Sequence, residues 1–108
     1  MDDEISIAEF VSLYLDNQGA ITTCLHNKKG LLEQLEMDNH FDIFITDMIM
    51  PDLSGREAVE LVKQKYPNIV IYSMSGYIAI EEQKWNYPVL RKPFNSRELS
   101  HFLEKQHH

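Results

Sequence analysis

The sequence contains little of several features that mark particular classes of protein. Its 108 residues include one cysteine, Cys24, so an internal disulfide is excluded and a reducing compartment, the cytoplasm, is expected. Its four glycines are too scattered for a dinucleotide-binding loop. No apolar run is long enough to cross a bilayer and no signal peptide is apparent, so we expect no membrane partner.

Positive charge is also scarce. Ten lysines and arginines face 17 aspartates and glutamates, which gives a formal net charge of −7. A surface of that sign repels phosphate backbones, so nucleic acid is not expected as a direct partner. The five histidines lack the paired spacing of a zinc site. Hydrophobic residues make up 44% of a chain long enough to bury one core, so residues 1–108 are expected to form a single domain.

Helical and strand patterns alternate along the chain. The spacing of apolar residues predicts helices over about 4–17, 27–39, 54–66, 78–85 and 95–106, and strands over 20–26, 42–46, 69–74 and 88–91. Asn27 is expected to cap the second helix, and the tetrads SGRE (54–57) and NSRE (95–98) have the pattern of capping boxes. This alternation predicts a doubly wound α/β fold, in which helices cover both faces of a parallel sheet.

Chemically useful side chains follow the predicted strands. Asp47 ends the strand at 42–46, Ser75 follows the strand at 69–74, and Lys92 follows the strand at 88–91. Asp2 and Asp3 stand just before the first helix. In such sheets ligands bind beyond the carboxyl ends of the strands, so we expect these residues to meet at one edge.

The chemistry of this set favours phosphoryl transfer. Clustered carboxylates repel one another unless a cation is present, and Mg²⁺ is a hard cation that takes carboxylate oxygens. One carboxylate can then attack phosphorus, while the metal, a lysine and a hydroxyl stabilise the charge on the phosphoryl oxygens.

These residues give the chain a resemblance to the receiver (response-regulator) domain of bacterial two-component signalling, over nearly its full length. The acidic pair of that family matches Asp2-Asp3, and its phosphoacceptor motif matches ITDMIMPDLSG, which contains Asp47. The serine or threonine of the switch matches Ser75 in MSG, and the Lys-Pro pair matches Lys92-Pro93 in LRKPF. The fold implied is flavodoxin-like (CheY-like), with three α/β/α layers and strand order 2-1-3-4-5.

The resemblance also implies a metal site. Asp3, Asp47 and the backbone carbonyl of Ile49 would ligate Mg²⁺, and Asp2 would act through a metal-bound water. The serine at 73 has the same strand parity as Ser75, and the glycine that follows Ser75 favours Ser75 for the switch position.

Three further roles follow from the same resemblance. Asp47 would accept a phosphoryl group from a histidine kinase or phosphotransfer protein, Ser75 would bond one phosphoryl oxygen, and Lys92 would pair with another. The Lys92–Pro93 peptide bond is expected to be cis. Enzymatic activity would be limited to Mg²⁺-dependent autophosphorylation and autodephosphorylation.

One departure from the family concerns its first strand. The family has an apolar strand before the acidic pair, whereas only Met1 stands there in this chain. Its absence predicts a gap of about two strand spacings, ~10 Å, between segments 20–26 and 42–46. The alternatives are a shortened chain, direct pairing of these two segments, or a strand borrowed from a second copy in a swapped homodimer.

Smaller departures bear on signalling. The position three before Lys92 is usually aromatic in switching receivers and is Val89 here, so Tyr77 or Tyr87 would have to substitute. Alternative roles also remain open: Asp2 and Asp3 could complement the dipole of the first helix, and Lys92 could be a surface lysine.

The main hypothesis is therefore a phosphoacceptor receiver domain, phosphorylated on Asp47, which switches a protein-interaction surface for a downstream output protein or domain. An interaction module that is not phosphorylated and acts through a constitutive or strand-swapped dimer is the alternative from another class. A phosphatase with an aspartate nucleophile is disfavoured, because Ile49 stands where its second catalytic aspartate would be.

Overall fold

The computed structural model describes residues 1–76 and 85–106. The helices in these residues are α1 (Ile5–Asn17), α2 (Lys28–Glu36), α3 (Gly55–Lys65) and α4 (Ser96–Gln106). The strands are β1 (Ile43–Asp47), β2 (Val70–Ser75) and β3 (Val89–Arg91). None of the helices in these ranges is long and apolar enough to cross a membrane.

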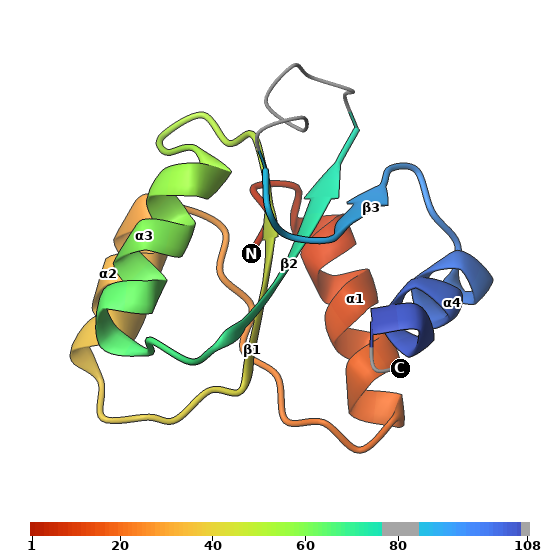
Figure 1. Cartoon of the computed structure of the whole chain (residues 1–108), viewed down its shortest axis with the longest axis horizontal. Coiled ribbons are helices and arrows are strands. Elements are labelled where there is room, and N and C mark those ends of the chain that lie inside the picture. Colours follow the sequence, from red (N-terminus) through yellow and green to blue (C-terminus); the bar gives the residue numbers. More distant parts are fainter. Residues whose placement is uncertain (77–84, 107–108) are drawn as a thin grey trace.

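The strands form a parallel sheet in the order β1-β2-β3, with helices on both faces (Figure 1). Helices α2 and α3 pack on one face around a core that includes Leu31, Phe44 and Val62. On the other face α1 and α4 enclose a second core, which contains Val11 and Leu99. This arrangement confirms the predicted three-layer, flavodoxin-like α/β fold.

Local hydrogen bonds start the helices where the sequence predicts. The side chain of Asn27 accepts a hydrogen bond of 2.8 Å from the N–H of Gly30 at the start of α2. Ser54 and Glu57 form a capping box at α3. The tetrad at 95–98 does the same before α4, with reciprocal bonds of 3.1 and 2.8 Å between its first and last residues. These bonds satisfy N–H groups that a helix leaves unpaired in its first turn.

The prediction of a strand at 20–26 is wrong. Within the described residues this segment has no regular secondary structure and belongs to no sheet. Its carbonyl at Leu25 accepts a hydrogen bond of 2.9 Å from the N–H of Asp2. Direct pairing of 20–26 with β1 does not occur either, because the edge of β1 that faces away from β2 bonds to Met1 instead. The predicted helix over 78–85 lies outside the described residues except for Trp85.

Met1 bonds to β1 in the manner of a parallel strand. Its amino group donates to the carbonyl of Ile45 at 2.5 Å, and its carbonyl accepts from the N–H of Asp47 at 2.9 Å. These two bonds, together with the bond from Asp2 to Leu25, place the first two residues between β1 and segment 20–26. The acidic pair is therefore held at the carboxyl edge of the sheet by backbone bonds on both sides.

Gly55 allows the loop after β1 to pass close to the start of α3. A Cβ atom added at Gly55 would lie 2.7 Å from the Cα of Met48 and 3.1 Å from the carbonyl oxygen of Asp47. We therefore expect Gly55→Ala to lower the free energy of unfolding by about 1–3 kcal/mol, since backbone atoms must move to relieve the overlap. Urea denaturation of both chains measures this difference.

Gly76→Ala is the matched control for this prediction. A Cβ atom at Gly76 would have its nearest contact at 3.7 Å, with the side chain of Lys92, which is an ordinary van der Waals distance. The expected change is within about 0.5 kcal/mol. Equal stabilities of the two alanine variants would contradict the close approach at Gly55.

Candidate functional site

The carboxyl edge of the sheet gathers the residues singled out in the sequence. Asp47 is the last residue of β1, Ser75 is the last residue of β2, and Lys92 follows β3 directly. Asp2 and Asp3 reach the same edge just before α1. The Lys92–Pro93 peptide bond is cis, as the resemblance implies.

Three carboxylates lie close together at this edge. One oxygen from each of Asp2, Asp3 and Asp47 lies within 4.8 Å of the other two. Asp2 is fully buried and Asp47 is nearly so, at 7% exposure, whereas Asp3 is exposed. The Oδ1 of Asp2 accepts a hydrogen bond of 3.0 Å from the N–H of Glu4, which fixes its orientation. The cluster therefore combines two buried, positioned carboxylates with one that reaches solvent.

Lys92 is the cation of the site. Its Nζ lies 2.6 Å from Oδ2 of Asp2 and 3.3 Å from Oδ1 of Asp47. A third carboxylate, that of Glu4, approaches to 3.6 Å. Apart from its ion pair with Lys92, Oδ2 of Asp2 has no hydrogen-bond partner among the described residues. The ammonium group thus holds together two carboxylates that would otherwise repel each other in a buried place.

The pKa values of these groups depend on burial and on each other. Burial raises the pKa of Asp47 from 3.8 to about 6; Lys92 opposes this shift and Asp2 adds to it. Burial alone would lower the pKa of Lys92, but its contacts with Asp2 and Asp47 outweigh that effect and raise it. The buried α-amino group of Met1 has a pKa lowered by burial from 8.0 to about 6. The metal-free site therefore disfavours the ionised form of Asp47.

The two candidate serines lie on the same strand. Ser73 is fully buried, and its hydroxyl oxygen accepts a hydrogen bond of 2.7 Å from Nε1 of Trp85. Ser75 is also buried, and its carbonyl accepts a bond of 2.8 Å from the N–H of Lys92. The backbone of Ser75 is thus bonded to Lys92, which carries the ammonium group. Ser73 lies two residues earlier on the same strand, and its hydroxyl is already bonded to Trp85.

Ile49 lies in the loop that follows β1. Its side chain is 58% exposed, and its backbone forms an isolated antiparallel bridge with Ser54, next to the start of α3. This bridge fixes the backbone two residues after Asp47. The role of its carbonyl oxygen as a metal ligand stays a prediction.

The donor set suits a hard divalent cation. Its atoms are carboxylate oxygens, and the pKa of one of the carboxyls, that of Asp47, is raised because burial disfavours its charged form. Mg²⁺ favours such oxygens and is commonly held by one or two carboxylates together with waters. The acidic cluster of Asp2, Asp3 and Asp47 could therefore hold a metal ion.

Two contacts at this edge were not foreseen from the sequence. Glu4 adds a further negative charge near Lys92; its place next to the acidic pair is the only signal that could have indicated it. Trp85 is linked to β2 by its hydrogen bond to Ser73. The guanidinium carbon of Arg56 lies 5.7 Å from the centroid of the Trp85 ring. No local pattern in the sequence predicts these long-range contacts.

A doubly wound sheet with an acidic cluster and a lysine at its carboxyl edge defines a class of α/β domain suited to binding a metal and a phosphoryl group. Residues 1–104 match the family model described as the response regulator receiver domain, and the chain belongs to this family.

Individual relatives agree with this assignment. The chain is 26% identical over 109 residues to the response regulator receiver protein CpdR of Brucella abortus, covering 96% of this chain and 90% of CpdR. It is 25% identical over 119 residues to the DNA-binding transcriptional regulator NtrC of Escherichia coli K12, covering 98% of this chain but 25% of NtrC. The structure of the chemotaxis response regulator CheY4 of Vibrio cholerae superposes with a TM-score of 0.81 and 27% identity, covering 96% of this chain and 92% of CheY4.

Proposed function

We propose that residues 1–108 form one receiver domain of a two-component phosphorelay, in which Asp47 accepts a phosphoryl group from a histidine kinase or phosphotransfer protein. The observation that carries the proposal is the position of Asp47: a nearly buried carboxylate at a strand end, beside Lys92 and two other carboxylates. Membership of the receiver family supports the same role. A cytoplasmic location fits this partner.

The proposed reaction is an in-line transfer. An oxygen of ionised Asp47 attacks phosphorus, a new P–O bond forms, and the P–N bond to the donor histidine breaks; the imidazole leaves with its electron pair and takes up a proton. Bound Mg²⁺ would neutralise negative charge on the phosphoryl oxygens. Lys92 can pair with one of these oxygens, and the hydroxyl of Ser75 is proposed to bond another.

The residues proposed to hold Mg²⁺ are Asp3, Asp47 and the carbonyl of Ile49, with Asp2 acting through a bound water. The burial of Asp2 and its ion pair with Lys92 support this indirect role, because both of its oxygens are already engaged.

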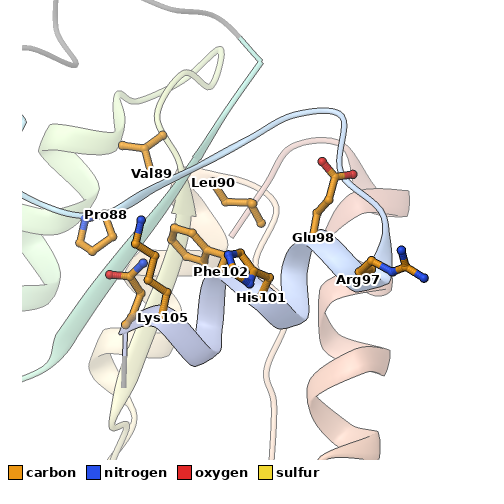
Figure 2. A pocket seen from close by; sticks show the side chains of 9 residues that line it. Pro88, Val89, Leu90, Arg97, Glu98, His101, Phe102 and Lys105 are labelled. Atoms are coloured by element: carbon orange, nitrogen blue, oxygen red, sulfur yellow. The ribbon is translucent and has the colours of Figure 1, made fainter. Parts of the chain in front are cut away.

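The proposed output surface lies on β3 and α4 (Figure 2). A pocket of about 760 Å³ lies there between the apolar residues at 88–90 and the C-terminal helix. Arg97, His101 and Lys105 line it at intervals of four residues, so they share one face of the helix. Arg97 and Lys105 give this face positive charge, which Glu98 partly offsets, and together with the apolar residues at 88–90 they support a partner with apolar and acidic side chains.

The test is the intact mass of the protein after incubation with Mg²⁺ and acetyl phosphate. Wild-type protein is expected to gain one phosphoryl group, and Asp47→Asn is expected to gain none, because the amide is not a nucleophile under these conditions. Asp42→Asn serves as the matched control, since Asp42 is an exposed carboxylate next to the same strand and should leave the adduct unchanged.

Two results would contradict the proposal. An adduct that persists in Asp47→Asn would place the modification elsewhere, and no adduct on a folded wild-type chain would mean that Asp47 is not an acceptor. In the second case the interaction module that is not phosphorylated becomes the better account.

A further inference from the structure

Two consecutive residues, Leu25 and His26, hold the backbone of Asp2. The carbonyl of Leu25 accepts a hydrogen bond of 2.9 Å from the N–H of Asp2, and Nδ1 of His26 lies 3.1 Å from the carbonyl oxygen of Asp2. A carbonyl oxygen can only accept a hydrogen bond, so Nδ1 of His26 carries the hydrogen and donates it. The two peptide groups that flank Asp2 are therefore both bonded to the same short segment.

The carboxylate of Asp3 has no comparable support of its own. One of its oxygens lies within 4.8 Å of an oxygen from each of Asp2 and Asp47, but its side chain forms no hydrogen bond or ion pair with residues 1–76 or 85–106. The carboxylate of Asp2, in contrast, is held at both oxygens, by the N–H of Glu4 at 3.0 Å and by Lys92 at 2.6 Å. The place of the Asp3 side chain therefore depends on its backbone.

The hydrogen bond from His26 acts on that backbone. The carbonyl of Asp2 belongs to the peptide group that joins Asp2 to Asp3. A peptide group is planar, so a bond that fixes the direction of this carbonyl also fixes the N–Cα bond of Asp3, beyond which its side chain extends. Among the described residues no other hydrogen bond reaches this carbonyl. Within this part of the chain, His26 is the side chain that orients the peptide group between the two aspartates.

We propose that His26 is a positioning residue of the metal site, whose hydrogen bond to the carbonyl of Asp2 directs the carboxylate of Asp3 to a cation shared with Asp47. This inference rests on the Mg²⁺ site of the proposed function. Groups that bond a metal ligand directly contribute about 10- to 100-fold to metal affinity. His26 acts through one peptide group, so we expect a smaller effect of about three- to tenfold, which corresponds to one hydrogen bond.

The backbone position of residue 26 does not depend on its imidazole. On one side, the carbonyl of Leu25 keeps its own bond to the N–H of Asp2. On the other side, the side chain of Asn27 caps α2, and the N–H of Lys28 donates a bond of 2.7 Å to Oδ2 of Asp52. Because His26 is only partly buried, a smaller side chain there opens no enclosed cavity. Substitutions at this position therefore test the hydrogen bond itself.

The test is isothermal titration calorimetry with Mg²⁺ alone, without any phosphodonor, on the wild-type chain, His26→Asn and His26→Leu. Asn and Leu have similar shapes, but only the Asn amide can donate a hydrogen bond from near the position of Nδ1. The dissociation constant for Mg²⁺ is expected to rise about three- to tenfold in His26→Leu and to stay within about twofold of the wild-type value in His26→Asn. The control is His40→Leu, at an exposed histidine before β1 and so at the opposite edge of the sheet, which should bind Mg²⁺ as the wild type does.

A double-mutant cycle shows whether His26 acts through Asp3. In an Asp3→Ala background the side chain that His26 is proposed to place is absent, so His26→Leu should then lower the affinity for Mg²⁺ by less than about twofold. A purely structural role of the histidine would lower the affinity to the same degree in both backgrounds. Midpoints of thermal unfolding in EDTA are compared for all four chains, and His26→Ala replaces the leucine variant if that does not fold.

Three results would overturn the inference. These are equal affinities of the wild type and His26→Leu, equal losses of affinity in His26→Asn and His26→Leu, or a loss that persists undiminished in the Asp3→Ala background. No binding of Mg²⁺ to the folded wild-type chain would overturn the metal site of the proposed function together with this inference. Because no phosphodonor is present, a failure of Asp47 as phosphoacceptor leaves these measurements unchanged, and the two failures are distinguishable.

Discussion

Lys92→Met is expected to lower the free energy of unfolding by about 3 kcal/mol in EDTA. The substitution keeps an apolar side chain of similar length but removes the charge that lies 2.6 Å from Asp2 and 3.3 Å from Asp47. Removing one partner of a buried ion pair leaves an uncompensated charge, which typically costs about 3–5 kcal/mol. Protonation of Asp47, whose pKa is already raised, keeps the loss near the lower end of that range.

Mg²⁺ should restore part of the stability that Lys92→Met loses, because a divalent cation can replace the ammonium as counter-charge for the same carboxylates. Chemical denaturation with and without Mg²⁺ measures both effects. Lys29→Met, at an exposed lysine of α2, is the control and should change the stability by no more than about 0.5 kcal/mol. A Lys92→Met chain as stable as this control in EDTA would show that the ion pairs contribute nothing to the fold.

The part of the fold that follows local rules was predictable from the sequence. Periodic apolar residues and short capping motifs place α1, α3 and α4 within one or two residues of their observed bounds. The continuous apolar run at 43–45 correctly indicated a strand, and helices lie on both faces of its sheet, although Ile43 at the start of β1 is exposed. These signals succeed because each depends on residues within about four positions of one another.

Segment 20–26 shows why the rest was not predictable. Its alternating, β-branched sequence favours a strand, but the segment has no regular secondary structure. Whether such a segment becomes a strand depends on a partner at the right distance, and the partner here, Met1 and Asp2, supplies a single backbone bond from the N–H of Asp2. The local pattern therefore predicts a preference for a strand, whereas the pairing that completes a strand depends on residues far away in the sequence.

The candidate site was also predictable only in part. The order of strand ends was enough to predict that Asp47, Ser75 and Lys92 meet, because parallel strands end at one edge. The ion pairs of Lys92 with Asp2 and Glu4 depend on distances between segments about 90 residues apart in sequence, which no local pattern encodes. The role of Asp47 in phosphoryl transfer is a proposal, which the adduct experiment tests.

The stability of the metal-free chain should fall as the pH rises from about 4 to 7, in comparison with the Asp47→Asn variant. The pKa of Asp47 is 3.8 when unperturbed and about 6 in the folded chain, so between these values the folded state binds more protons than the unfolded state. Stability therefore decreases with rising pH in this window, and the contribution of the protonated carboxyl is lost above pH 6. Two pKa units correspond to about 3 kcal/mol.

The measurement is the difference between the unfolding free energies of wild type and Asp47→Asn, followed across that pH range in EDTA. Groups that do not interact with Asp47 contribute equally to both chains, so their contributions cancel in the difference. With saturating Mg²⁺ the decrease should disappear, because the cation favours the ionised form of Asp47 that the metal-free site disfavours. A difference in unfolding free energy that does not change with pH in EDTA would mean that the pKa of Asp47 is the same in the folded and unfolded chains. Burial and Asp2 would then not disfavour its ionised form. If the decrease is found and Mg²⁺ removes it, the burial of Asp47 and its repulsion by Asp2, which disfavour the ionised carboxylate in the metal-free chain, would also give the acidic cluster its affinity for a divalent cation.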